Sequence, residues 1–196
     1  MPKPLTSQGG FSLVETMTLV ALLGVITTAL YTIMNNMTTQ SERMRVMADL
    51  LRQGDRIKNE MSVSAQRTGH KKEIGAAMTR SQAVNFVTSS HVQLCADNIS
   101  GTRQLTEYRL STLVDGKGSL EKRVSSTACL ADASQSWESV SPALLTSLEF
   151  SMETTTPPSL ILKSKFTLSK TVPGSSEVQT ITQQHLLPTY ALVGLD

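Results

Sequence analysis

The chain has 196 residues, enough for one ordinary domain plus an appendage. Charged residues make up 17% and the formal net charge is +2, so the charge balance gives no reason to expect nucleic acid or an acidic partner. The apolar residues are unevenly distributed, because Glu15 is the only charged residue between Phe11 and Met34. This asymmetry predicts an apolar N-terminal segment followed by a polar domain.

Residues 11–34 are predicted to form a membrane-spanning helix. These 24 residues would extend about 36 Å at about 1.5 Å per residue, which exceeds a hydrocarbon core of about 30 Å. A secretory signal would have a shorter apolar centre, followed by small residues at a cleavage site, and residues 35–40 carry no such pattern. A plain single-pass anchor remains an alternative, although it does not account for the residues before the helix.

Residues 1–10 are short and polar, carry Lys3 and end in glycine, and Phe11-Ser-Leu-Val-Glu15 follows them. A cationic flank such as Lys3 favours an N-terminus that stays in the cytoplasm. A carboxylate inside a membrane helix costs roughly 2.5–3.5 kcal/mol at the bilayer centre and less near the interface. Glu15 is therefore expected to find a counter-charge, the alternative being a side chain that extends to the lipid headgroups.

This N-terminus resembles that of the type IV pilin family, at Gly10, Phe11, Leu13, Glu15 and Gly24. The resemblance covers about the first 30 residues. It implies that prepilin peptidase cleaves between Gly10 and Phe11, removing residues 1–10 as a leader, and that the new Phe11 amine is N-methylated. It also implies that Glu15 pairs with the amine of a neighbouring subunit in a filament.

Two further positions in this helix bear on the resemblance. Gly24 would allow close helix approach, as small residues do in membrane bundles, and the alternative is a glycine tolerated in lipid. Thr32 stands where many major pilins have a proline that kinks the helix. This departure favours a minor pilin or a pseudopilin.

Residues 35–67 are predicted to continue as an amphipathic helix that packs against the remaining domain. Apolar side chains recur at spacings of mostly three and four, which is typical of one helix face. They are Met44, Met47, Leu50, Leu51, Ile57 and Met61. The pattern breaks at residues 68–72, where we expect the helix to end.

Residues 68–196 are predicted to form a β-rich head. Residues 91–96 alternate as in a strand, and Asp115-Gly-Lys-Gly118 reads as the turn of a hairpin between residues 104–114 and 119–125. A second hairpin is expected between residues 144–153 and 160–170, and a strand over 178–187 that Pro188 ends. The fold class is therefore α+β, with one long N-terminal helix packed against an antiparallel sheet of five or six strands. The late strands loosely resemble those of the larger minor pilins, including the J-type or W-type group, and of J-type pseudopilins.

Cys95 and Cys129 lie in the predicted head. In an exported domain an even number of cysteines suggests a disulfide. In a cytosolic protein, two buried thiols would be the simpler interpretation. The pairing therefore depends on whether the chain crosses a membrane.

The sequence contains no recognisable catalytic or metal-binding motif. His70, His91 and His185 are scattered, with no cysteine or carboxylate at metal-ligand spacing. There is no phosphate-binding glycine loop and no nucleophile motif. We predict no enzyme activity, no catalytic residue, no metal and no cofactor.

The sequence thus predicts a minor pilin of a type IV pilus. Before assembly it would be a single-pass inner-membrane protein with a cytoplasmic N-terminus and a periplasmic head. Its partners would be prepilin peptidase, the other pilins and the inner-membrane assembly platform. A pseudopilin of a type II secretion system is an alternative, and a membrane-anchored periplasmic binding module that never polymerises is another.

Overall fold

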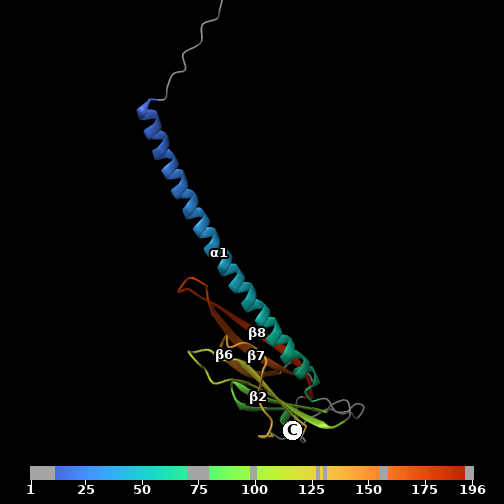
Figure 1. The fold of residues 1–196 in the computed structure, drawn as a ribbon. Coiled ribbons are helices and arrows are strands. Elements are labelled where there is room, and N and C mark those ends of the chain that lie inside the picture. Colours follow the sequence, from blue (N-terminus) through green and yellow to red (C-terminus); the bar gives the residue numbers. More distant parts are fainter. Residues whose placement is uncertain are drawn as a thin grey trace, which may run out of the picture. The chain divides into compact units, whose positions relative to one another are not determined.

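The computed structural model describes residues 12–69, 80–97, 101–126, 129, 132–154 and 159–192. The chain divides into two compact units, residues 1–44 and residues 45–196, and the long helix α1 (Leu13–Arg67) contributes to both. Figure 1 shows α1 and the strands that follow it along the chain.

The first unit is helical from Leu13 onward. Ser12 precedes the helix, and its carbonyl oxygen accepts the first intrahelical hydrogen bond, from the Thr16 N–H at 3.1 Å. Every residue from 12 to 38 is exposed within the chain. An 18-residue window of α1 has a mean hydropathy of 2.0 and none of it is buried, so the helix is long and apolar enough to cross a membrane. The predicted apolar helix is confirmed.

In the second unit, α1 buries one face against the head. The buried positions recur every three or four residues, which places them on one side of the helix. They are Val46, Leu50, Gly54, Ile57, Met61 and Ala65. The prediction was correct for Leu50, Ile57 and Met61 but wrong for Met44 and Leu51, which are 70% and 46% exposed.

The first sheet has five antiparallel strands in sequential order. The short helix α2 (Arg80–Ala83) leads into it. The strands are β1 (Val84–Thr88), β2 (His91–Asp97), β3 (Arg103–Leu110), β4 (Leu120–Ser125) and β5 (Glu138–Ser139). The predicted hairpin between β3 and β4 is confirmed, and Asp115 and Gly116 form its turn with φ of 51° and 73°. Positive φ at both central residues is the mark of a type I′ turn, and Asp-Gly suits it.

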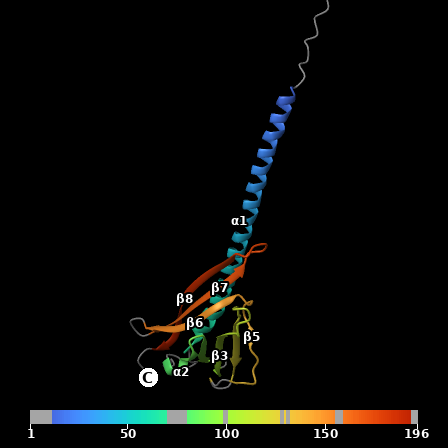
Figure 2. The same ribbon diagram turned by 90° about the vertical axis from the view of Figure 1, so that its left-hand side faces the viewer.

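The second sheet has three antiparallel strands, β6 (Leu145–Thr154), β7 (Ser159–Thr171) and β8 (Val178–Leu192). A bridge between Gly118 and Leu145 connects it to the first sheet. Figure 2 shows the two sheets as separate groups of strands. Alternate residues of β7 point into the core, and Leu160, Leu162, Phe166 and Leu168 are fully buried. The predicted hairpin formed by these two long strands, β6 and β7, is confirmed.

Two details of the strand prediction need correction. The described residues form eight strands in two sheets, where we expected five or six strands in one sheet. Pro188 does not end its strand, because β8 continues to Leu192 and Pro188 pairs with Ile161. β8 lies at the edge of its sheet, where a residue without an N–H is tolerated, and the pairing shifts register between Ser159 and Ile161.

Tyr108 of β3 connects the first sheet to the last turns of α1 through hydrogen bonds. Its side chain is fully buried, and its hydroxyl lies 2.8 Å from the Ser64 hydroxyl and donates to the Glu60 carbonyl at 3.2 Å. Burial raises the pKa of this phenol far above its usual value. The Glu60 carboxylate also pairs with Lys122 of β4 at 2.6 Å. The α+β architecture, with a long helix packed against antiparallel strands, is therefore confirmed.

Candidate functional site

The first turn of α1 contains Glu15, for which the sequence predicts a role in filament assembly. The Ser12 N–H donates to the Glu15 carboxylate at 3.4 Å. Serine at the N-cap with glutamate three residues later is the spacing of a capping box, in which the glutamate satisfies a helix-terminal N–H. The Ser12-x-x-Glu15 spacing is visible in the sequence, yet sequence analysis did not use it. The helix N-terminus therefore offsets part of the cost of this carboxylate.

The predicted cleavage point, Gly10 and Phe11, lies outside the described residues, as does Lys3. The described helix begins two residues after Phe11. Along the sequence, Glu15 lies four residues after Phe11, the residue that would carry the expected new amine.

In the exposed part of α1, the hydroxyl groups of the threonines form hydrogen bonds with the backbone of the same helix. Each donates to a backbone carbonyl three or four residues earlier, at 2.8–3.0 Å. Such bonds remove the cost of placing a hydroxyl in an apolar medium. They are made by Thr16, Thr18, Thr27, Thr28, Thr32, Thr38 and Thr39. The helix is unbroken at Thr32, the position where the resemblance would allow a proline kink.

Among the described residues, none packs against Gly24. A Cβ built at this position meets no atom within 4 Å. Its carbonyl oxygen accepts hydrogen bonds from the Thr27 and Thr28 hydroxyls at 3.0 Å and 2.8 Å. This surface is open to close approach by another helix, as small residues allow in membrane bundles.

The head contains a charged cluster on one face of the first sheet, centred on Glu107. This carboxylate is fully buried. It accepts hydrogen bonds from Arg123 at 2.6 Å and Gln93 at 2.8 Å, and His91 Nε2 lies 3.3 Å away. Burial acts to raise the pKa of Glu107, but the hydrogen bonds and the Arg123 charge outweigh it and lower the pKa.

Trp137, the only tryptophan of the chain, lies over this cluster. The guanidinium carbons of Arg109 and Arg123 are 3.9 Å and 4.5 Å from its ring centroid. The His91 ring meets it edge-on at 5.6 Å. These contacts are cation–π and aromatic contacts that favour a fixed ring position. Because the carboxylate is fully paired, the cluster has the character of a structural network.

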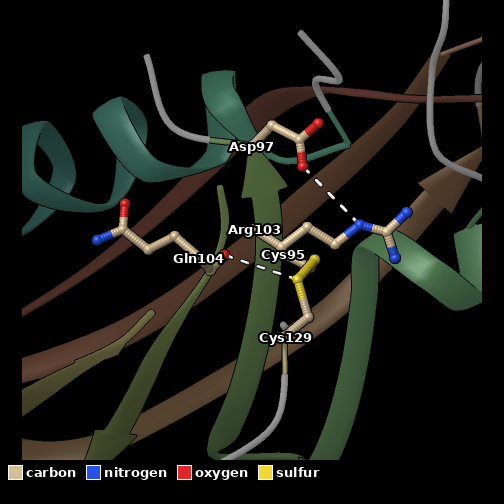
Figure 3. Close-up of a disulfide and its surroundings, with 5 residues drawn as sticks. All are labelled: Cys95, Asp97, Arg103, Gln104 and Cys129. Carbon is tan, nitrogen blue, oxygen red and sulfur yellow. Dashed lines mark hydrogen bonds and ion pairs between the residues drawn. A yellow bond between two sulfur atoms is a disulfide. The ribbon is translucent and has the colours of Figure 1, made fainter. Parts of the chain in front are cut away.

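The disulfide prediction is confirmed. Cys95 of β2 and Cys129 form a disulfide with their Cα atoms 5.6 Å apart. Figure 3 shows the bond beside the ion pair of Asp97 and Arg103, whose closest atoms are 3.9 Å apart. Within the described ranges, no group of three histidine, cysteine, aspartate or glutamate residues is placed to hold a metal ion.

A hollow with both polar and apolar lining lies between the last turns of α1 and strands β2, β3 and β4. Its volume is about 180 Å³, which corresponds to roughly six water molecules. It is lined by the Glu60–Lys122 ion pair, by Ser64 and Arg67 of α1, and by Leu94 among others. The hollow is smaller than most small-molecule pockets.

No known protein-family model, curated protein or solved structure matches this chain.

Proposed function

We propose that this protein is a minor pilin of a type IV pilus. The observation that carries the proposal is an apolar helix, exposed along residues 12–38, whose only charged residue up to Met34 is Glu15 in its first turn. The short polar segment ending in Gly10, followed by Phe11, supports the same conclusion.

The exposed apolar surface of this helix must be covered, because its contact with water is unfavourable. Lipid covers it before assembly, and a bundle of similar helices covers it in a filament. Moving the helix from lipid into a dry bundle leaves the Glu15 carboxylate without headgroups or water, so it needs a counter-charge. Cleavage after Gly10 would create an amine on Phe11, near the start of each neighbouring helix. In the proposed filament, neighbouring helices are shifted along the filament axis, so that the Phe11 amine of one subunit lies near Glu15 of the next.

The threonine-lined and glycine-containing surface supports assembly through this helix. The threonine hydroxyls are hydrogen-bonded to the backbone of their own helix, so they need no partner on a neighbouring helix. The open surface at Gly24 allows a neighbouring helix to approach closely. Tyr108 and the Asp49–Lys170 pair at 2.5 Å hold the head to the part of α1 that lies in the second unit, so in this proposal the head enters the filament together with that part of the helix. In this proposal the N-terminus is cytoplasmic and the head is periplasmic before assembly.

Processing can be tested by expressing the full chain with and without a prepilin peptidase and measuring its intact mass. We expect loss of the ten-residue leader only when the peptidase is present. Gly10→Val should block the loss, and the matched variant Gly9→Ala should not. An unchanged mass in both strains would contradict the proposal and favour a simple anchor.

A pseudopilin of a type II secretion system is the second candidate. The uninterrupted helix at Thr32 favours a minor pilin or pseudopilin over a major pilin, but does not separate the first two. Deletion of the gene in its native host discriminates: loss of surface pili supports the minor pilin, and loss of protein secretion with intact pili supports the pseudopilin.

A further inference from the structure

The two cysteines of the Cys95–Cys129 disulfide differ in exposure. Cys95 is in the middle of the first sheet, paired with Leu105 of β3, and is 4% exposed. Cys129 is outside the described strands and only partly buried. Its φ of 61° is a conformation that non-glycine residues rarely adopt.

The strand that carries Cys95 does not need the disulfide to stay in its sheet. Seven residue pairs join β2 to β3, and six pairs join β3 to β4. On its helix-facing side, Val92 and Leu94 of β2 lie in the hydrophobic core. Opening the bond therefore leaves Cys95 in a paired, buried strand, and only the attachment of Cys129 is released.

We propose that Cys129 is a thiol-exchange site, at which a small thiol or a dithiol oxidoreductase opens and closes the bond on the folded head. Cys95 is the buried partner sulfur. Exchange requires the attacking thiolate to approach a disulfide sulfur, and access decides which sulfur is attacked. Of the two cysteines, Cys129 is the partly exposed residue, whereas Cys95 is buried.

The reaction balances with two thiols. A thiolate attacks Sγ of Cys129, the S–S bond breaks, and its electron pair goes to Sγ of Cys95, which takes a proton. Cys129 is then in a mixed disulfide with the reagent. A second thiolate attacks the reagent sulfur, releases Cys129 as a thiol and leaves an oxidised reagent disulfide. Bond formation follows the same steps in reverse, with a disulfide as the oxidant.

Two features of Cys129 favour this role. Without the bond, its backbone is free to leave the left-handed region for an ordinary conformation. Its sulfur lies 3.8 Å from the carbonyl oxygen of Gln104 (Figure 3), so the thiol formed on reduction can donate a hydrogen bond to that oxygen. Cys95 lies among the buried residues of the core, whereas Cys129 is partly buried and packs against that core from its edge.

The test uses the full chain in detergent micelles with glutathione as the probe. After brief exposure to reduced glutathione and trapping with an alkylating agent, peptide mass spectrometry locates the adduct. We expect glutathione on Cys129, with Trp137 emission unchanged because the sheet remains folded. An adduct on Cys95, or reduction that occurs only together with loss of the Trp137 signal, would overturn the proposal.

The single-cysteine variants give a second measurement. Cys95→Ser leaves a thiol at Cys129, and Cys129→Ser leaves one at Cys95. Without denaturant, a maleimide reagent should modify Cys129 at least about tenfold faster than Cys95, because reaction rate follows access to the thiolate. In urea the two rates should become equal. Equal rates in the folded variants would contradict the proposal, and should a variant fail to fold, the glutathione adduct on the native chain decides. Neither result depends on filament assembly.

Discussion

Gly54 lies on the buried face of α1, at a point where the structure leaves no room for a side chain. A Cβ at this position would lie 2.3 Å from Oε1 and 2.7 Å from Cδ of Gln183 in β8. The Gln183 amide oxygen also lies 3.2 Å from the His185 ring nitrogen, within hydrogen-bond distance. The substitution Gly54→Ala therefore sets two effects against each other.

The first effect is a gain of about 1 kcal/mol, because alanine is the better helix former. The second is the displacement of Gln183, which loses a hydrogen bond of about 1 kcal/mol and takes an off-rotamer cost of about 0.5–1.5 kcal/mol. We expect Gly54→Ala to lower the free energy of unfolding by about 0.5–1.5 kcal/mol, because the two losses together exceed the helix gain. In a Gln183→Ala background, the same change should raise it by about 1 kcal/mol, because only the helix term remains.

The assay is urea unfolding of the full chain in detergent, followed by Trp137 fluorescence, on the two single variants and the double variant. Gly24→Ala is the matched control, since its new Cβ meets no atom within 4 Å, and it should leave the head transition unchanged. A stabilisation by Gly54→Ala that is the same with and without Gln183 would refute this account of how α1 packs against β8.

The remaining predictions concern assembly, the disulfide and pH. Glu15→Ala should remove both the capping contact and the charge, whereas Glu15→Gln keeps a capping residue but removes the charge. Both variants should reduce incorporation into sheared filaments, and normal incorporation of Glu15→Gln would exclude charge pairing as the role. Cys95→Ser removes a disulfide with a sequence separation of 34 and should cost the head about 4 kcal/mol in the chain-entropy model, measured as a shift in the urea midpoint; an unchanged midpoint would contradict it. Desolvation, and then the Lys58 charge, lower the pKa of His185 below its usual 6.5. The unfolded chain therefore binds this proton first, so stability should be full above about pH 6.5 and fall as the pH decreases toward the lowered folded value. His185→Gln should flatten that part of a pH–stability curve, and an unaltered slope would refute the assignment.

The periodic parts of the chain could be predicted from the sequence because their signal is local. The apolar N-terminal helix, the β3–β4 turn at Asp115-Gly116 and the β6–β7 hairpin all follow from neighbouring residues. The choice of the buried face of α1 was less certain, because Met44 and Leu51 fit one periodic stripe while Val46 and Ala65 fit another. Contacts with the sheets, which are distant in sequence, select the second stripe.

The charged cluster could not be predicted, because its partners are far apart along the chain. Glu107 is a fully buried glutamate in a strand whose polar residues would ordinarily face water. Its burial depends on Arg123 and Gln93, which come from the two adjacent strands, β4 and β2. Strand β5, which follows Trp137, has only two residues and leaves no pattern to detect. The Ser12–Glu15 contact differs, since its spacing is a recognisable helix-start signal.

The central claim is that a polar leader is removed to expose an amine that Glu15 neutralises on a neighbouring subunit. Intact mass spectrometry of the protein purified from its native cells tests this claim most directly. The account predicts a polypeptide that begins at Phe11 and carries one additional methyl group on its amine. A mature chain that still begins at Met1 or Pro2 would contradict it.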